Sequence, residues 1–174
     1  MDVAQVLLDA YGRIEEEVRA AVEGLDTAAL LWRPDPDANP IGWLVWHLAR
    51  VQDDHVADLA GTDQVWSSEA WPQRFGLDPD DMSIGYGHTS EQVGAVRPDG
   101  PDTLLAYLDA VAERTRDLLR GLAPDDLDRV VDTSWDPPVT MGVRLVSVLS
   151  DDLQHAGQAA YLRGLYERTA PADR

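Results

Sequence analysis

Four long stretches with apolar residues at helical spacing are the feature that most restricts the fold of this chain. They repeat apolar residues at intervals of three and four, with polar residues between them, over about 2–24, 40–60, 101–122 and 140–168. This pattern predicts an all-α fold, a four-helix bundle with a long crossover between the second and third helices. We expect a single domain over 1–170, followed by a frayed end at 171–174.

Residue types at the ends of these stretches predict where three of the helices begin. Asp2, Asn39 and Thr140 carry side chains that are favoured at the cap position, and Pro40 suits the first turn of a helix. We therefore expect side-chain caps on the first, second and fourth helices.

The crossover between the second and third helices covers about 62–100, which is long for a compact domain. Connections of this length tend to be functional or to contain small elements of their own. Thr89 followed by Gln92 is the signature of a capping box, which predicts one short helix there. The only strand candidate in the chain is the weak signal "RVVDTSW" at 129–135.

Charge and composition exclude several kinds of partner. The formal net charge is −18, from 32 acidic and 14 basic residues, and this field would repel nucleic-acid phosphates. The chain has no cysteine, so it can form neither a disulfide nor a thiolate metal site. No apolar run approaches the ~20 residues of a membrane span, and the N-terminus is acidic and amphipathic, unlike a signal peptide. We expect a cytoplasmic protein without nucleic-acid or membrane partners.

The last helical stretch contains a carboxylate and an imidazole one turn apart, in "SDDLQHAGQAAYLRG" at 150–164. Asp151 and His155 lie over the same turn, where one ion can bind both. A carboxylate at the edge of an apolar stripe is costly unless it is paired with a cation or a metal. The spacing alone is a weak signal, because it is common by chance and an ion pair without metal satisfies it equally.

This last helix has two apolar faces. One stripe contains Met141, Leu145, Val148, His155, Ala159 and Leu162, and the other contains Val146, Leu149, Leu153, Ala156 and Ala160. A helix with two apolar faces is expected to be covered twice, here by its own bundle and by a second subunit. The pattern therefore favours a homodimer.

The second helix offers two histidines as partners for that pair. His55 lies in the middle of the apolar stripe, whereas His47 lies ~80° away at its border, beside Trp43 and Asp54. His55 could equally be a core imidazole with one hydrogen bond, and His47 could pair with Asp54 or with solvent. Periodicity nominates either histidine.

The segments "NPIGWLVWHLARVQDDH" (39–55) and "LVSVLSDDLQHAGQAAYLRG" (145–164) resemble the DinB-like superfamily of four-helix metalloproteins. Within it, the sequence is similar to the branch that includes the metal-binding domain of mycothiol-dependent maleylpyruvate isomerase. The resemblance implies a divalent metal held by one histidine of the second helix and two ligands of the last helix, which fall on His47, Asp151 and His155. Asp151 stands where family members have His or Glu, so Asp152 is an alternative ligand.

The resemblance also implies a chemistry. Two imidazoles and a carboxylate suit zinc and also nickel, iron or manganese, and the ligand set alone does not choose among these metals. Zinc is our first expectation. Family members use a low-molecular-weight thiol such as mycothiol or bacillithiol, and the isomerases contain a second domain that contributes catalytic groups. Our hypothesis is a metal-dependent thiol transferase or isomerase that acts on a small-molecule electrophile. The alternatives are a non-catalytic metal-binding bundle, with His55 or Asp54 closing the site, and a dimeric scaffold without metal that has a stress-related role.

Several further residues are candidates for lining this site. His88, in the glycine-flanked "GYGH" of the crossover, is a candidate acid or base or else a solvent-exposed loop residue. Arg144 is a candidate for pairing with the carboxylate of the last helix or for holding an anionic substrate, and Gln158 lies one turn from the imidazole. Trp43 and Trp46 either wall the pocket or belong to the ordinary core.

Overall fold

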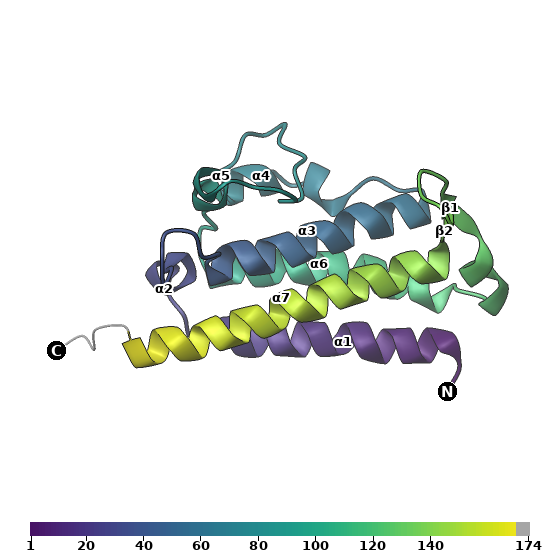
Figure 1. The fold of residues 1–174 in the computed structure, drawn as a ribbon, viewed down its shortest axis with the longest axis horizontal. Helices are drawn as coiled ribbons and strands as arrows, with labels where there is room; N and C mark the ends of the chain where they lie inside the picture. The colour runs from purple at the N-terminus through teal and green to yellow at the C-terminus, as the bar shows by residue number, and fades with distance from the viewer. Residues whose placement is uncertain (170–174) are drawn as a thin grey trace.

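Four long helices lie side by side in a computed structural model that describes residues 1–169 (Figure 1). They are α1 (Val3–Val22), α3 (Ile41–Ala60), α6 (Pro101–Arg120) and α7 (Met141–Thr169). Both α1 and α3 pack against α6 and α7. The mostly helical class predicted from the sequence is confirmed, and the predicted frayed end at 171–174 lies outside the described residues. No described helix combines the length and the apolar character that crossing a bilayer requires.

The shorter elements occupy the connections between the long helices. They are α2 (Thr27–Leu31), η1 (Val65–Ser67), α4 (Trp71–Arg74), α5 (Ser90–Ala95) and η2 (Pro124–Asp128). A small antiparallel sheet departs from a purely helical fold. Its strands β1 (Val130–Asp132) and β2 (Val139–Thr140) pair Val130 with Thr140. The weak strand signal in "RVVDTSW" was therefore genuine, and the second strand leads directly into α7.

The helix starts follow the predicted caps in all but one case. The Asp2 carboxylate accepts the backbone N–H of Gln5 in a capping box, and Thr89 caps α5 in the same way. Thr140 Oγ1 accepts the backbone N–H of Val143 at 3.4 Å. The prediction for α3 was wrong by one residue, because Pro40 rather than Asn39 occupies the cap position and no side chain caps this helix.

Helix α3 is buried around its whole circumference, and every residue from 41 to 53 is buried. Helices α6 and α7 cover part of its surface, and Figure 1 shows α4 and α5 over the side of α3 that faces away from α1. Trp43 and Trp46 are 5% and 0% exposed, so both belong to the core. The crossover is thus a third layer of the fold.

A buried ionic network fastens the crossover to α3. Arg50 is fully buried, and its guanidinium donates to the carbonyl oxygens of Met82 at 3.1 Å and Ser83 at 3.2 Å. Its counter-ion is Asp53, at 3.4 Å, which also accepts the Tyr107 hydroxyl at 2.7 Å. Because a buried ion pair is tolerated only when its remaining hydrogen bonds are made, this network fixes the segment of the crossover that reaches the candidate site.

Candidate metal centre

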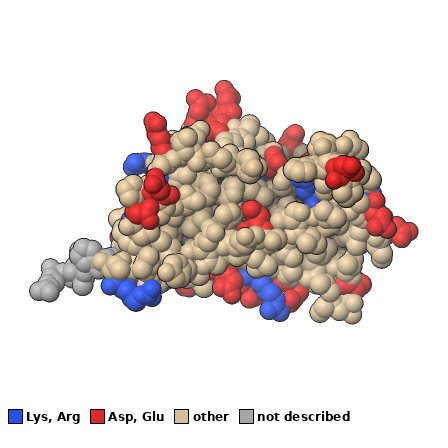
Figure 2. Space-filling view, viewed as in Figure 1, with Lys and Arg blue, Asp and Glu red and all other residues tan. Residues whose placement is uncertain are grey.

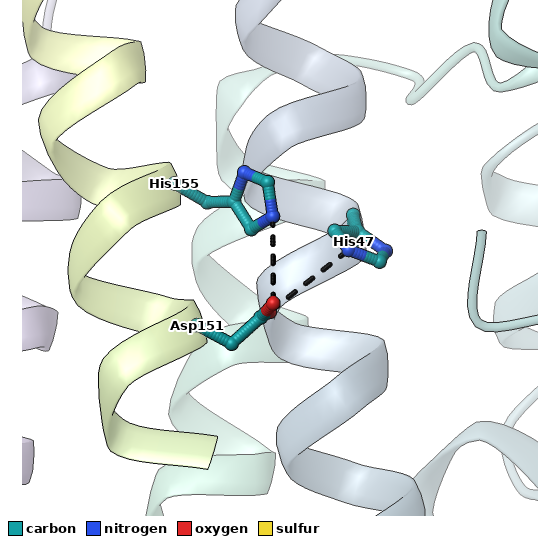
Figure 3. Close-up of side chains that lie close together, drawn as sticks. All are labelled: His47, Asp151 and His155. Atoms are coloured by element: carbon teal, nitrogen blue, oxygen red, sulfur yellow. Dashed lines mark ion pairs between the residues drawn. The ribbon is translucent and has the colours of Figure 1, made fainter. Parts of the chain in front are cut away.

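Two helices bring three potential metal ligands together. His47 comes from α3, and Asp151 and His155 come from consecutive turns of α7, with all three side chains directed toward one another (Figure 3). His47 Nε2 lies 3.9 Å from Asp151 Oδ2, and His155 Nε2 lies 3.7 Å from Asp151 Oδ1. One ligand atom from each residue lies within 4.8 Å of the other two.

Hydrogen bonds to the outer nitrogens set the tautomers of both imidazoles. His47 Nδ1 contacts the carbonyl oxygen of Ile84, and His155 Nδ1 lies 2.9 Å from Oε1 of Gln158. Since both partners are acceptors, each Nδ1 is the nitrogen that carries a proton. Each Nε2 is therefore the nitrogen directed toward Asp151, and in a neutral ring it is the one that could bind a metal.

The Asp151 carboxylate fits a metal better than it fits its protein neighbours. Its Oδ2 atom is buried and has no hydrogen-bond partner among the described residues, although 37% of the side chain is exposed. Burial lowers the pKa of His47, so the neutral imidazole that a metal requires is favoured there. Bonds of ~2.1 Å in a tetrahedral site place ligand atoms about 3.4 Å apart. The observed separations need only a small inward movement of the side chains.

The alternative ligands considered from the sequence lie elsewhere. The nitrogens of His55 lie 3.3 and 3.4 Å from Arg144 Nη1, and Asp54 accepts a hydrogen bond from Gln64 at 2.7 Å. Asp152 is fully buried in the core. Within residues 1–169, the cluster of potential ligand atoms contains His47, Asp151 and His155 but not His55, Asp54 or Asp152. The structure thus brings His47 to the α7 pair, whereas periodicity left the choice open.

The candidate residue Arg144 is bound away from the trio. Its guanidinium pairs with Asp132 at 2.8 Å and lies beside His55, so the expected pair with Asp151 is not formed. The physical reason is the β1–β2 hairpin, which brings the Asp132 carboxylate to the start of α7.

The candidate residue His88 fastens the crossover loop. Its Nδ1 accepts the indole N–H of Trp43 at 3.3 Å, and its Nε2 lies 2.8 Å from the hydroxyl of Ser83. The side chain is half-buried rather than solvent-exposed. With both ring nitrogens engaged, His88 holds the loop that passes over the metal centre.

No pattern of residues predicts the backbone that packs against the candidate metal centre. Gly85 has φ +93°, and a Cβ there would lie 2.8 Å from His47 Nδ1 and 2.9 Å from the Trp46 ring. The absence of a Cβ at this glycine allows the loop backbone to approach the imidazole. Trp43 stacks on the His47 ring, with ring centroids 4.6 Å apart, and a Cβ at Gly85 would lie 3.1 Å from this indole as well. The indole and the glycine backbone therefore both pack closely around the imidazole.

A cavity of about 210 Å³ opens beside the trio and borders His47 and Asp151. A metal bound by three protein ligands would thus have an open coordination position next to an accessible space.

Comparisons with known proteins agree with this arrangement. The sequence profile of the DinB superfamily matches residues 10–159. A crystal structure described as the conserved protein of a locus from Enterococcus faecalis superposes with a TM-score of 0.89 and 32% identity, covering 97% of this chain and 99% of that one. No protein of curated function matches. By its sequence, this chain belongs to the DinB superfamily.

Proposed function

We propose that His47, Asp151 and His155 hold a divalent metal ion, with zinc as the first candidate. The observation that carries this proposal is the buried Oδ2 of Asp151, which has no hydrogen-bond partner among the described residues and lies in a carboxylate that faces the Nε2 atoms of two imidazoles. A buried carboxylate oxygen without a partner is costly, and a shared cation offsets that cost. Two neutral imidazoles and one carboxylate are a common zinc ligand set.

We further propose that the metal serves chemistry rather than structure alone. A closed structural site would need a fourth ligand, but His55 and Asp54 have other partners. The cavity beside His47 and Asp151 leaves room for an incoming molecule instead. These contacts favour an open site over the rival, a purely structural ion.

The reaction that this site suits best is a thiol-dependent transfer or isomerisation on a small electrophile. A bound divalent ion would supply Lewis acidity that lowers the pKa of a coordinated thiol or water. The chain has no cysteine, so the thiol must come from a small molecule of the mycothiol type. Trp43 and Gly85 shield one ligand from solvent, and Gln158 orients another.

Metal content is the first test. Protein purified without a polyhistidine tag should contain a stoichiometric divalent metal by elemental analysis, and Asp151→Asn should lose it. Asp54→Asn makes the same change at the acid of the closed-site alternative, and we expect it to retain the metal. A metal-free wild-type protein would refute the proposal and would favour the metal-free scaffold. Loss of metal in Asp54→Asn would instead support a closed structural site.

Thiol binding is the second test, and it separates a catalytic site from a storage site. In cobalt-substituted protein, a small thiol should produce a thiolate-to-metal charge-transfer band, and His155→Gln should abolish it. If no thiol changes the spectrum at any pH, the ion is not available to thiols and the transferase or isomerase proposal fails.

The exposed side of α7 supports the proposal of a homodimer. The second apolar stripe is divided, because Ala156 is buried whereas Val146 and Leu153 are 58% and 44% exposed. The exposed residues between Val143 and Tyr161 are all uncharged. Figure 2 shows a broad uncharged band on this face, with acidic residues gathered mainly at its margins. In a chain of net charge −18, this face is where a second copy can approach with least repulsion.

Light scattering tests the homodimer. We expect a dimer mass for the wild type and a monomer mass for Leu153→Glu. Met82→Glu places the same charge at an exposed apolar side chain of the crossover and should remain dimeric. A wild-type monomer at micromolar concentration would refute the proposal.

A further inference from the structure

The cavity beside the metal centre has a definite chemical character. Its volume of about 210 Å³ is below the roughly 300–1,000 Å³ of sites for drug-sized ligands, so it suits a small molecule or one end of a larger one. Its walls are mainly apolar, and the metal centre forms one end. The lining residues that give this character are Val51, Ile84, Tyr86 and Val148, with His47 and Asp151 at the metal end.

Within residues 1–169, no arginine lines this cavity, and the remaining polar wall residues are His55 and Ser147. Arg144 contacts His55, a residue of the cavity wall, but does not itself line the cavity. Its guanidinium pairs with Asp132. An imidazole that faces a guanidinium at 3.3 Å is favoured as the neutral form. On its other side, His55 Nδ1 lies 3.6 Å from the carboxylate of Asp54. An anionic group in the cavity would therefore meet the Asp151 carboxylate without an arginine in the lining to compensate its charge.

Tyr86 stands on a glycine-flanked turn at the mouth of the cavity. It belongs to the lining, yet 92% of its surface is exposed. Gly85 and Gly87 on either side have φ +93° and +71°, and the segments beyond them are fixed by the Ile84 carbonyl at His47 and by the two hydrogen bonds of His88. The turn is closed by the backbone N–H of His88, which donates to the carbonyl oxygen of Gly85 at 3.2 Å, and the Tyr86 side chain extends from it. Covering an apolar ligand would bury the tyrosine ring, and that burial is favourable.

We propose that this cavity binds the uncharged, apolar part of a small molecule and that Tyr86 closes over it, whereas the side chains of its wall disfavour a carboxylate. The assignment of this molecule as the electrophile rests on the proposed function, but its binding does not require a metal. The earlier alternative, in which Arg144 holds an anionic substrate, is replaced by a neutral substrate whose apolar end faces Val51 and Val148.

The experiment compares two probes of equal size, benzyl alcohol and benzoate, by ligand-detected NMR titration of the full chain as purified and after chelation. We expect benzyl alcohol to bind saturably in both samples. Benzoate should bind at least about tenfold more weakly once chelation has removed any metal that could hold it. Tyr86→Ala should weaken benzyl alcohol binding by about threefold to tenfold, the range of one aromatic contact.

A blocking variant and its control decide the location. Ser147 is exposed on α7 and lines the cavity, so Ser147→Trp should abolish benzyl alcohol binding. Ala106→Trp makes a similar change at an exposed position of α6 and should bind as the wild type does. The inference is overturned if benzyl alcohol does not bind, if benzoate binds as tightly after chelation, or if Ser147→Trp has no effect. A protein that binds benzyl alcohol but contains no metal would instead refute only the proposed function.

Discussion

Replacing Asp152 by asparagine should change how the stability of this protein depends on pH. Asp152 is fully buried on the core side of α7, and neither carboxylate oxygen has a hydrogen-bond partner among the described residues. Burial raises its pKa well above the ordinary value of 3.8, and the neighbouring charge of Asp151 raises it further. The folded protein thus favours the protonated carboxyl, whereas the unfolded chain releases the proton at its ordinary pKa.

The sign of the effect follows from proton linkage. The stability that this group contributes is fully present below pH 3.8 and is lost as pH rises from there through the raised pKa. One proton changes the unfolding free energy by at most about 1.4 kcal/mol per pH unit. Between pH 5 and pH 7, Asp152 can therefore destabilise the fold by at most about 3 kcal/mol.

Asparagine has nearly the same shape and does not titrate, so Asp152→Asn removes this loss. The buried amide of asparagine also destabilises the fold if it lacks hydrogen-bond partners, but this free-energy cost does not depend on pH. The measured quantity is thus the difference in unfolding free energy between variant and wild type, and it should shift in favour of the variant as pH rises from 5 to 7.

Urea unfolding followed by circular dichroism measures this difference. A chelator in all samples removes any contribution from metal binding. Asp63→Asn makes the same substitution at an exposed position, and its difference from the wild type should remain nearly constant with pH. A difference for Asp152→Asn that is flat across this range, or that favours the wild type at higher pH, would show that the buried carboxyl does not bind an extra proton in the fold.

Three substitutions test the surroundings of the metal centre. Gly85→Ala places a Cβ 2.8 Å from His47 Nδ1 at φ +93°, so unfolding by urea should show a loss of about 1–3 kcal/mol, and zinc titration a weaker site. Arg50→Met leaves a buried carboxylate without its counter-ion, and we expect a loss of about 3–5 kcal/mol by the same unfolding assay. Gln158→Leu removes the acceptor of His155 Nδ1 and should weaken zinc binding by about 10- to 100-fold, while the unfolding free energy of chelated protein stays unchanged.

Local periodicity was sufficient to predict the long helices and one buried face of α7. Met141, Leu145 and Val148 are buried as their spacing predicts, because neighbours at three and four positions share a helix face whatever lies opposite. The second face of α7 was predicted from the same rule. It stays partly exposed at Val146 and Leu153, because none of the elements described within residues 1–169 packs over it.

Periodicity did not predict which residues of α3 are buried, because residues 41–53 of this helix are covered on all sides. Charged residues such as Arg50 and Asp53 are usually found on the solvent-exposed face of a helix, yet these two are 0% and 3% exposed. Their burial depends on where the crossover docks, which is a tertiary property that spacing cannot express. The same cause left the choice between His47 and His55 open, since a helix with several buried faces offers more than one inward direction.

In the candidate site, spacing predicts some of the side chains but none of the backbone contacts. The spacing of Asp151 and His155 is a local property, so the sequence could nominate this pair. The acceptor that orients His47 is a backbone carbonyl, and every residue type has one. The positive φ of Gly85 accounts for a glycine at this position. A glycine in a loop has several ordinary explanations, so it does not by itself predict a close approach to His47.

The metal centre therefore depends on the crossover as much as on the two helices that carry the ligands. Arg50 holds the carbonyls of residues 82 and 83, and the next carbonyl in the chain, that of Ile84, fixes the tautomer of His47. If the crossover left α3, His47 would lose both its acceptor and its shield, and the imidazole could turn its protonated nitrogen toward Asp151. If a metal binds the trio as proposed, its affinity is thermodynamically linked to docking of the crossover, and the ion would stabilise the docked crossover by the same free energy that docking adds to metal binding.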